Sequence, residues 1–355
     1  MSRYQTLMSR IDGGIDALLI TSEKNQHYLG GFPFSDGYLL LTRQDALLLT
    51  DSRYVESAER EAYDEFTVLT MKGGLAATAM PYLDKVGAKV IGYEDSFLTC
   101  AELARLKRTF PEMELVPIGS VIEDMRIYKD EGELGKIISA QRIAEGALEH
   151  LLRVITPNMT EIEVAAELEY AMRKGGAQGT SFDTIAVSGS LSAVPHGVPR
   201  NVKLEKGFLT LDFGALCGGY CSDMTRTVCL GKADAEMKKV YDTVLRAQRA
   251  AIEAAHLGSD CGEIDGVARS IIAGAGYGEY FGHGLGHGVG MFIHEAPRLS
   301  AAGKGIPLTP GHVVTVEPGI YLPGRFGVRI EDMLVCHADS VEDITLAPKE
   351  LIELF

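Results

Sequence analysis

Residues 208–228 read Phe-Leu-Thr-Leu-Asp-Phe-Gly-Ala-Leu-Cys-Gly-Gly-Tyr-Cys-Ser-Asp-Met-Thr-Arg-Thr-Val. Apolar and polar residues alternate on either side of a Gly-rich centre, which is typical of two antiparallel strands joined by a turn. Asp212 and Asp223 are symmetric about Cys217 and Gly218. A loop at those two residues would place the aspartates opposite each other, with Cβ atoms ~5 Å apart. A longer loop or a one-residue slip of the register stays open, because Cys is not a favoured loop residue.

A second acidic hairpin follows at residues 313–335. Glu317 and Glu331 are symmetric about Gly324, with Pro323, Gly324 and Arg325 as a three-residue loop. Like charges that face each other destabilise a sheet, and four carboxylates that converge need cations. Two divalent metal ions would supply +4 against −4, and this charge balance is the physical basis of our interpretation.

A nitrogen ligand is available in residues 281–298, Phe-Gly-His-Gly-Leu-Gly-His-Gly-Val-Gly-Met-Phe-Ile-His-Glu-Ala-Pro-Arg. This stretch contains His283, His287 and His294, three of the nine histidines of the chain. Its alternating glycines let the backbone pass close to a site. It is not a phosphate-binding loop, because no Lys-Ser/Thr follows it. Another histidine, His196, lies between two prolines.

Each feature also has a plain structural explanation. Asp in Asp-Phe-Gly is often a turn or surface residue, Glu before Pro-Gly can end a strand in solvent, and a Gly/His segment can be a mobile loop. Asp332 and Asp51 are interpreted as structural. Two symmetric acidic hairpins together with the histidine cluster nevertheless favour a metal site.

Composition limits the class of protein. The chain has 355 residues, of which 46% are hydrophobic and 23% charged, which predicts about two globular domains. The net charge of 34 − 49 = −15 argues against nucleic acid as a partner. No apolar run reaches the ~20 residues of a membrane helix, and no signal peptide is visible, so we expect a cytoplasmic protein. The six cysteines form no Cys-x-x-Cys pair and are expected to be buried, reduced thiols.

The first ~125 residues alternate apolar runs with helical patterns, which predicts an α/β layer. Because the first strands are close together in sequence, part of the sheet should be antiparallel. The expected strands are 17–21, 38–42, 46–50, 66–70, 89–93 and 114–118, and the expected helices are 54–62, 74–86 and 100–110.

From residue 124 the pattern predicts an α+β domain with helices against a curved antiparallel sheet. The expected helices are 130–154, 160–174, 233–256 and 260–273. Thr160 with Glu163 forms a capping-box signature, which Asp260 with Glu263 repeats.

The motifs resemble the pita-bread metallopeptidases, and within them the branch of prolidase and aminopeptidase P. The second half carries Leu211-Asp-Phe-Gly, Ser222-Asp-Met-Thr-Arg-Thr, His283-Gly-Leu-Gly-His, Val316-Glu-Pro-Gly-Ile-Tyr and Val328-Arg-Ile-Glu-Asp in the order of the family. The first half contains Asn25-Gln-His-Tyr-Leu-Gly-Gly-Phe and Thr50-Asp-Ser-Arg-Tyr, similar to the creatinase/prolidase N-terminal domain. The resemblance therefore implies an N-terminal α/β domain at residues 1–123 and a catalytic pita-bread domain at residues 124–355.

The resemblance implies two divalent ions, Mn²⁺ or Co²⁺ before Zn²⁺, because most of the ligands would be oxygens. The implied ligands are Asp212, Asp223, His287, Glu317 and Glu331. All five are present, unlike in creatinase and in non-catalytic modules of the same fold.

The implied reaction is hydrolysis of the Xaa-Pro peptide bond by water that the two ions activate. Glu317 would shuttle the proton to the proline nitrogen, which as a tertiary amide carries no hydrogen. His196 and His294 would bind the scissile carbonyl and the developing oxyanion. Arg329 would either orient a ligand carboxylate or reach the substrate, and the two roles stay equal.

For the substrate, the resemblance implies that His283 lines the proline pocket with Tyr321 nearby. Arg298 resembles the position that holds the free carboxylate of a dipeptide, with a surface salt bridge as the alternative. A proline dipeptidase is therefore preferred over an Xaa-Pro aminopeptidase acting on tripeptides and longer peptides. An aminopeptidase without proline preference and a non-catalytic peptide-binding module are the remaining alternatives.

The family resemblance also implies a homodimer in which the N-terminal domain caps the site of the partner subunit. Asp36, in Phe34-Ser-Asp-Gly, would be a candidate to approach that neighbouring site. A turn residue is the preferred role for Asp36.

Overall fold

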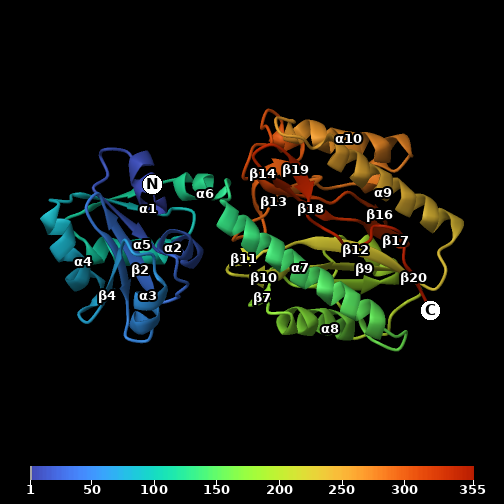
Figure 1. Cartoon of the computed structure of the whole chain (residues 1–355), viewed down its shortest axis with the longest axis horizontal. Coiled ribbons are helices and arrows are strands. Elements are labelled where there is room, and N and C mark those ends of the chain that lie inside the picture. The colour runs from blue at the N-terminus through green and yellow to red at the C-terminus, as the bar shows by residue number, and fades with distance from the viewer. Residues whose placement is uncertain (1) are drawn as a thin grey trace. The chain divides into compact units, whose positions relative to one another are not determined.

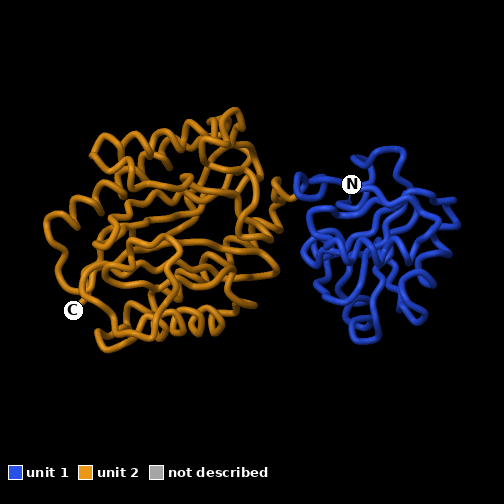
Figure 2. The backbone as a smooth tube through the Cα atoms, turned by 180° about the vertical axis from the view of Figure 1, so that it is seen from behind, with its two compact units in different colours: residues 1–125 blue, residues 126–355 orange. Residues whose placement is uncertain are grey.

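The computed structural model describes residues 2–355, and the chain divides into two compact units. Their junction in the sequence lies between Met125 and Arg126, as Figure 2 shows by colour. Each unit has its own sheets and its own hydrophobic core.

The first unit is built on one six-stranded sheet. Its strands, in the order in which they pair, are β4 (Phe66–Thr70), β3 (Ala46–Thr50), β2 (Gly37–Thr42), β1 (Ala17–Ile20), β5 (Val90–Tyr93) and β6 (Glu114–Pro117). The β1–β2 and β2–β3 pairs are antiparallel and the others are parallel. The expectation of a partly antiparallel sheet is confirmed. The connection between β2 and β3 is too short for a crossover helix, whereas α2 (Glu23–Gly30) lies between β1 and β2.

The helices of the first unit include three that the apolar pattern predicted and three that it did not. They are α1 (Arg3–Arg10), α2 (Glu23–Gly30), α3 (Val55–Glu61), α4 (Gly74–Lys85), α5 (Cys100–Thr109) and α6 (Val121–Arg126). The missed α1 begins with a capping box in which Ser2 and Gln5 bond each other's backbone. The missed α2 ends at Gly31, whose φ of 80° stops the helix.

Four long helices lie in two pairs in the second unit (Figure 1). They are α7 (Glu131–Val154), α8 (Glu161–Lys174), α9 (Ala235–Ala254) and α10 (Cys261–Gly274). The capping box of Thr160 and Glu163 is confirmed. At α10 only half of the expected box forms: Asp260 accepts from the backbone, but no bond returns from the Glu263 side chain.

The strands of the second unit form four small sheets. They are β7 (Gly179–Thr180), β8 (Ile185–Ser188), β9 (Gly207–Phe213), β10 (Ala215–Cys217), β11 (Tyr220–Cys221), β12 (Met224–Leu230), β13 (Gly286–Gly288), β14 (Glu295–Leu299), β15 (Val313–Val316), β16 (Gly319–Leu322), β17 (Phe326–Arg329), β18 (Asp332–Cys336), β19 (Val341–Asp343) and β20 (Glu353–Leu354). One sheet has the order β20-β12-β9-β8 and another the order β14-β13-β15-β18-β19. All pairs in these two sheets are antiparallel except β12–β20.

Each helix pair covers one of these two sheets. The apolar face of α7 and α8 packs on β9 and β12 in one core, and α9 and α10 pack on β15 and β18 in another. Within α7, the apolar residues that are buried are Ile137, Ala140, Ala144, Ala147, Leu148 and Leu151. Each of the two sheets is therefore backed by its own pair of helices.

Two expectations from composition can be compared with residues 2–355. All six cysteines are free; four are buried, Cys217 is partly buried and Cys100 is exposed, so the expectation of buried thiols is wrong for Cys100. None of the helices described is long and apolar enough to cross a bilayer.

The packing of α7 gives a first prediction. Leu151 is fully buried against α8 and the sheet, so Leu151→Ala should lower the free energy of unfolding of the second unit by about 2–5 kcal/mol. Urea unfolding followed by far-UV circular dichroism measures this change. Arg153→Ala, at an exposed position of the same helix, is the matched control and should change it by less than about 0.5 kcal/mol. Equal losses in the two variants would contradict the packing.

Candidate metal centre

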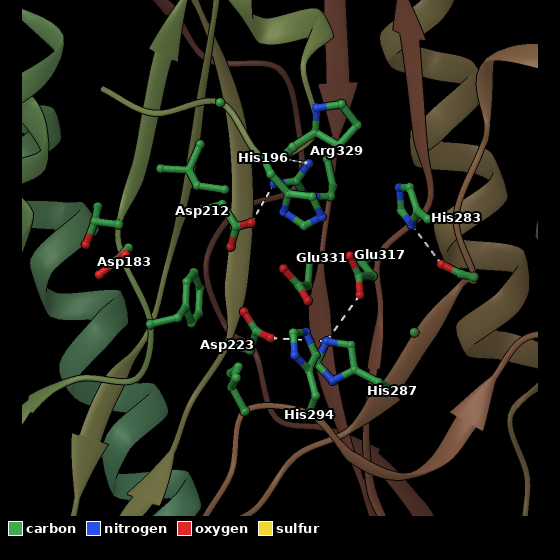
Figure 3. A pocket seen from close by; sticks show the side chains of 18 of the residues that line it. Asp183, His196, Asp212, Asp223, His283, His287, His294, Glu317, Arg329 and Glu331 are labelled. Carbon is green, nitrogen blue, oxygen red and sulfur yellow. Dashed lines mark hydrogen bonds and ion pairs between the residues drawn. The ribbon is translucent and has the colours of Figure 1, made fainter. Parts of the chain in front are cut away.

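Five predicted ligands line one cavity of about 690 Å³ in the second unit (Figure 3). Asp212 belongs to β9 and Asp223 immediately precedes β12. His287 is the central residue of β13, Glu317 follows β15, and Glu331 precedes β18. The two sheets thus contribute separate parts of the same cluster.

The first acidic hairpin does not have the register that its symmetry suggested. Asp212 pairs with Thr225, and the two-residue turn is Gly218–Gly219, because Cys217 pairs with Tyr220. Both glycines have positive φ, 57° and 82°, which a tight hairpin turn requires and Cys217 would not accept easily. Because the turn is shifted by one residue, each residue of β9 pairs with a residue two positions further along the opposite strand. Asp212 and Asp223 therefore still point to the same face of the sheet, as diagonal neighbours. The prediction of directly opposed aspartates is therefore wrong.

The second hairpin has the predicted register. Gly319 pairs with Arg329 and Leu322 with Phe326, which leaves Pro323–Arg325 as the three-residue loop. In the same register Val316 pairs with Asp332, so Glu317 and Glu331 lie opposite each other. Their backbone N–H groups turn away, to Leu285 O and Thr225 O, and the hairpin opens at this point.

Glycines let the backbone of β13 pass between its neighbours. A Cβ atom on Gly286 would lie 2.0 Å from the Thr315 carbonyl oxygen, and one on Gly288 would lie 2.2 Å from the Ala296 carbonyl oxygen. No side chain fits at either position. The glycines on both sides of His287 are therefore what allows this imidazole to reach the acidic cluster.

Three of the ligands converge tightly. Donor atoms of Asp223, His287 and Glu331 lie within 4.8 Å of one another, and all three residues are buried. His287 Nε2 is also 3.4 Å from Glu317 Oε1. His287 Nδ1 is 3.0 Å from the Gly288 carbonyl oxygen, which fixes Nδ1 as the donor and leaves the Nε2 lone pair for a metal ion.

Burial and mutual repulsion act strongly on the carboxylates. Desolvation, followed by the charge of Glu331, holds the pKa of Asp223 well above its usual range. Desolvation, followed by the charge of Glu317, does the same to the pKa of Glu331. Desolvation raises the pKa of Glu317 to about 8 and lowers the pKa of His287 to about 3. The surrounding protein groups therefore do not compensate the negative charge of these carboxylates when they are ionised.

The chemistry of the donors fits divalent cations. The cluster offers carboxylate oxygens and one neutral imidazole, and Asp212 Oδ1 is buried without a hydrogen-bond partner in residues 2–355. A buried orphan acceptor needs a compensating partner. A cation between the carboxylates would supply one and remove their repulsion.

Arg329 is bonded to Asp212, one of the predicted ligands. Its guanidinium donates to Asp212 Oδ2, to the Tyr321 hydroxyl at 2.9 Å and to Thr225 Oγ1 at 3.1 Å. Two roles were considered for Arg329. Because Nε, Nη1 and Nη2 of its guanidinium are all bonded to the protein, this geometry favours the role of orienting a carboxylate.

A chain of hydrogen bonds connects Arg329 to His283. The Tyr321 hydroxyl accepts from Arg329 and lies 2.9 Å from His283 Nε2, while His283 Nδ1 lies 2.8 Å from the Gly284 carbonyl oxygen. His283 therefore donates through Nδ1 and accepts from Tyr321 through Nε2. Desolvation lowers the pKa of His283 to about 4, which keeps this imidazole neutral.

The remaining predicted side chains line the same cavity and are exposed within it: His196, His294 and Arg298. The His294 ring lies 4.4 Å from the His287 ring, centroid to centroid. The Arg298 side chain makes no hydrogen bond or ion pair with any residue that the structure describes, which leaves its guanidinium available within the cavity. Asp36 lies elsewhere, exposed in the first unit, and bonds Arg53 at 2.8 Å.

Two threonines that the sequence reasoning missed hold the ligands. Thr225 donates to Glu331 Oε2 at 2.7 Å, and Thr315 donates to Glu317 Oε1 at 3.3 Å. Each lies two residues from an acidic ligand on the same strand face, which is the signal that could have revealed it. The wall formed by Phe182, Asp183 and Ile185 was also missed, and no charge pattern marks it.

Comparison with known proteins agrees with this geometry. The model of the Creatinase/Prolidase N-terminal domain matches residues 1–128, and the model of Metallopeptidase family M24 matches residues 135–338. The chain is 40% identical over 349 residues to a Xaa-Pro dipeptidase of Pyrococcus horikoshii, covering 95% of each chain.

Solved structures have the same fold over the full chain. A Xaa-Pro dipeptidase from Bacillus anthracis is 40% identical with a TM-score of 0.94 and 99% of each chain covered. An X-Pro aminopeptidase from Thermotoga maritima is 38% identical with a TM-score of 0.93, and 99% of this chain and 100% of that chain are covered. The expected combination of a creatinase/prolidase-type domain with a pita-bread domain is confirmed. With its acidic cluster, its neutral imidazole and its matches to both domain models, this chain belongs to metallopeptidase family M24.

Proposed function

We propose that the chain is a Xaa-Pro dipeptidase that holds two divalent metal ions. The observation that carries this proposal is the convergence of the buried donors in one cavity of a family M24 chain. Relatives over nearly the full length are named Xaa-Pro dipeptidases. The proposed ligands are Asp212, Asp223, His287, Glu317 and Glu331.

Charge supports two ions rather than one. Four carboxylates with a neutral imidazole carry −4, of which the Arg329 guanidinium offsets one charge, so a single divalent cation would still leave the buried cluster negative. The preponderance of oxygen donors supports Mn²⁺ or Co²⁺ over Zn²⁺. When bound, the ions supply Lewis-acid activation of water and of the scissile carbonyl.

Glu317 is the proposed proton shuttle. It lies at the cavity wall where the second hairpin opens, and its carboxylate is held by Thr315 at 3.3 Å. A carboxylate held in this way can take a proton from water and deliver it to the proline nitrogen. That nitrogen must gain a proton before it leaves, because an Xaa-Pro bond has no N–H of its own.

The exposed imidazoles are the proposed substrate donors. His294 stands beside His287 and, with His196, can donate to the scissile carbonyl and to the oxyanion that develops there. His283 and Tyr321 are bonded to each other and offer a neutral wall for the proline ring. Arg329 orients Asp212 and, through its hydrogen bond to the Tyr321 hydroxyl, holds that wall in place.

Arg298 supports a dipeptide substrate, because its unpaired guanidinium faces the cavity and can bind a free carboxylate. An Xaa-Pro aminopeptidase is the second candidate. The cavity of about 690 Å³ leaves room beyond two residues, and a relative of similar identity is named an X-Pro aminopeptidase.

Several finer points stay predictions. They are the choice among Mn²⁺, Co²⁺ and Zn²⁺, location in the cytoplasm, a homodimer, and the division into an N-terminal domain (1–123) and a catalytic domain (124–355). For Asp36, which bonds Arg53 on the surface of the first unit, both the turn role and the approach to a partner's site stay predictions.

The proposed function is tested with a dipeptide and a tripeptide. After chelation and re-addition of Mn²⁺ or Co²⁺, the chain should cleave Ala-Pro faster than Ala-Pro-Ala and leave Ala-Ala intact, as measured by release of free amino acids. Asp223→Asn should lower kcat by at least about a hundredfold, because it removes a charged ligand. Its fold should persist, since Asn places no extra charge in the cluster. Cleavage of Ala-Pro-Ala alone would favour the aminopeptidase, and full activity without metal would contradict both candidates.

Arg298 gives a sharper prediction about substrate length. A charge-assisted hydrogen bond is worth about 1.5–3 kcal/mol, so Arg298→Ala should lower kcat/KM for Ala-Pro by about 10–150-fold. The loss for Ala-Pro-Ala should be smaller, because its carboxylate lies one residue further along. Arg298→Lys should recover part of the activity on the dipeptide. Equal losses of kcat/KM on both peptides would show that Arg298 does not bind the C-terminal carboxylate of the dipeptide.

The acidic cluster predicts an unusual pH dependence of stability without metal. The raised pKa of Glu317, about 8, means that the folded chain binds more protons than the unfolded chain below this pH. The free energy of unfolding should therefore rise as the pH falls from 8 to 6.5, by up to about 1.4 kcal/mol per pH unit for each proton taken up. Below 6.5 the lowered pKa values of His283 and His287 act in the opposite direction.

Urea unfolding of the chelated chain at pH 8 and pH 6.5 measures this dependence. Glu317→Gln removes one titrating group and should flatten the pH profile. Identical profiles for the parent and the variant would contradict the electrostatic account of the cluster.

A further inference from the structure

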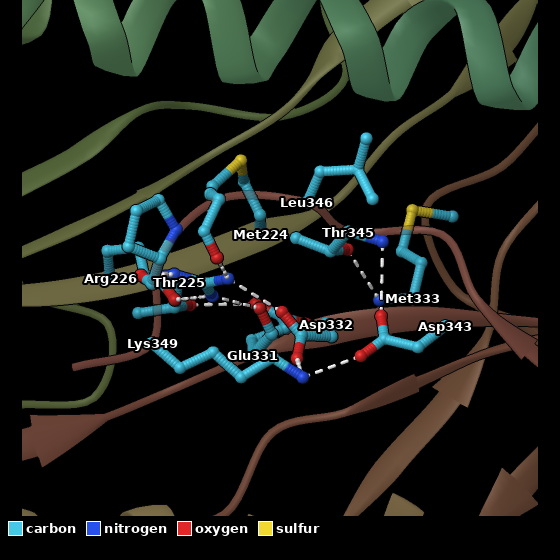
Figure 4. A network of polar contacts seen from close by, with 12 residues as sticks. Met224, Thr225, Arg226, Glu331, Asp332, Met333, Asp343, Thr345, Leu346 and Lys349 are labelled. Carbon is cyan, nitrogen blue, oxygen red and sulfur yellow. Dashed lines mark hydrogen bonds and ion pairs between the residues drawn. The ribbon is translucent and has the colours of Figure 1, made fainter.

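A buried arginine behind the cavity has all of its donors bonded (Figure 4). Arg226, in β12, is 2% exposed. Its Nε donates to Pro348 O at 2.8 Å, Nη1 donates to Thr225 O and Glu331 O at 2.9 and 2.6 Å, and Nη2 donates to Asp332 and Ala347 O, both at 2.7 Å. A guanidinium has five N–H groups, and these contacts use all five.

Asp332 provides the counter-charge. This carboxylate is fully buried and accepts from Arg226 through Oδ1 and from Gln248 and Lys349 through Oδ2. Lys349 also contacts Asp343, so two cations and two carboxylates balance. A buried ion pair tolerates the removal of one partner poorly, because the other charge is then left uncompensated.

The same arginine fixes the backbone of a proposed ligand. Glu331 donates its N–H to Thr225 O at 3.1 Å and accepts from Arg226 at its carbonyl, and its carboxylate accepts from Thr225 Oγ1. Asp332 bonds Arg226, while Glu331, the residue before it, lines the cavity. The direction of the Glu331 carboxylate thus depends on how this backbone is held.

We propose that Arg226 and Asp332 are a positioning pair that holds Glu331 in the geometry needed to bind a divalent cation. This inference rests on the proposed function for its biological meaning, but it concerns cation binding and can be measured without a peptide. A pair that served only the fold would stabilise the contact between β12 and residues 347–348 and leave cation affinity unchanged.

The test is calorimetric titration of Mn²⁺ into the chelated full-length chain, at a temperature at which circular dichroism shows every variant folded. Arg226→Lys keeps the charge but loses the fork that reaches both Glu331 and Asp332. It should weaken Mn²⁺ binding by about 10–100-fold, the range typical of partners that orient a metal ligand. Asp332→Asn, which keeps the shape of the side chain, should weaken binding in the same direction and serves if Arg226→Lys does not fold.

The matched control is Lys349→Met, which removes a cation from the same network without a contact to Glu331. It should lower the unfolding temperature and leave Mn²⁺ affinity as in the parent. Unchanged affinity in both Arg226→Lys and Asp332→Asn would overturn the proposal, as would an equal loss of affinity in Lys349→Met.

The two proposals fail differently. If the parent binds Mn²⁺, the variants bind it weakly and no Xaa-Pro peptide is cleaved, the positioning pair is supported and the peptidase assignment is contradicted. If the parent cleaves Ala-Pro with Mn²⁺ and the variants bind Mn²⁺ as tightly as the parent, the peptidase assignment is supported and the positioning pair is contradicted.

Discussion

The structure of the second unit depends on a concentration of negative charge away from water. Four carboxylates are brought together with a neutral imidazole, and desolvation and mutual repulsion push the pKa values of Asp223, Glu317 and Glu331 upward. Helix-backed sheets, glycines at the crossing of β13 and a cavity of about 690 Å³ keep this arrangement in place. Metal ions are the counter-charge that makes it favourable in its ionised form.

Around this cluster, the side chains divide into two groups by what they contact. Thr225, Thr315 and Arg329 bond the acidic ligands and fix their direction. His294 and Arg298 line the same cavity without such a bond, which suits the substrate-binding roles proposed for them. In the proposed function, the bonded side chains would keep the metal ligands in place while the unbonded ones meet the substrate.

Much of the fold and of the candidate site could be predicted from the sequence, and the predictions that were wrong have physical causes. The Pro323–Arg325 loop gave the correct register because its length and residues suit a three-residue turn. The first hairpin was misplaced because symmetry between Asp212 and Asp223 outweighed the preference of a tight turn for Gly218 and Gly219. Short helices such as α1 were not predicted, because they are defined by their capping residues and not by a long apolar stripe.

Site residues without a charge pattern were beyond the sequence for a different reason. The Phe182 wall and the bonds of Arg226 to residues 347–348 join segments far apart in the chain, and only the folded structure brings them together. The bond from Thr225 to Glu331 joins distant segments in the same way. By contrast, Thr315 lies two residues before Glu317, the residue that it bonds, and follows from strand alternation. Local periodicity therefore identifies ligands and their immediate supports, while contacts between distant segments remain invisible to it.

The division of the proposed ligands between two sheets links metal binding to the folding of the second unit. Asp212 and Asp223 come from the β20-β12-β9-β8 layer, and His287, Glu317 and Glu331 come from the β14-β13-β15-β18-β19 layer or its edges. Neither layer alone offers all five proposed ligands. A complete coordination sphere therefore exists only when both layers are in place, and ions bound there would stabilise the packing of one layer against the other.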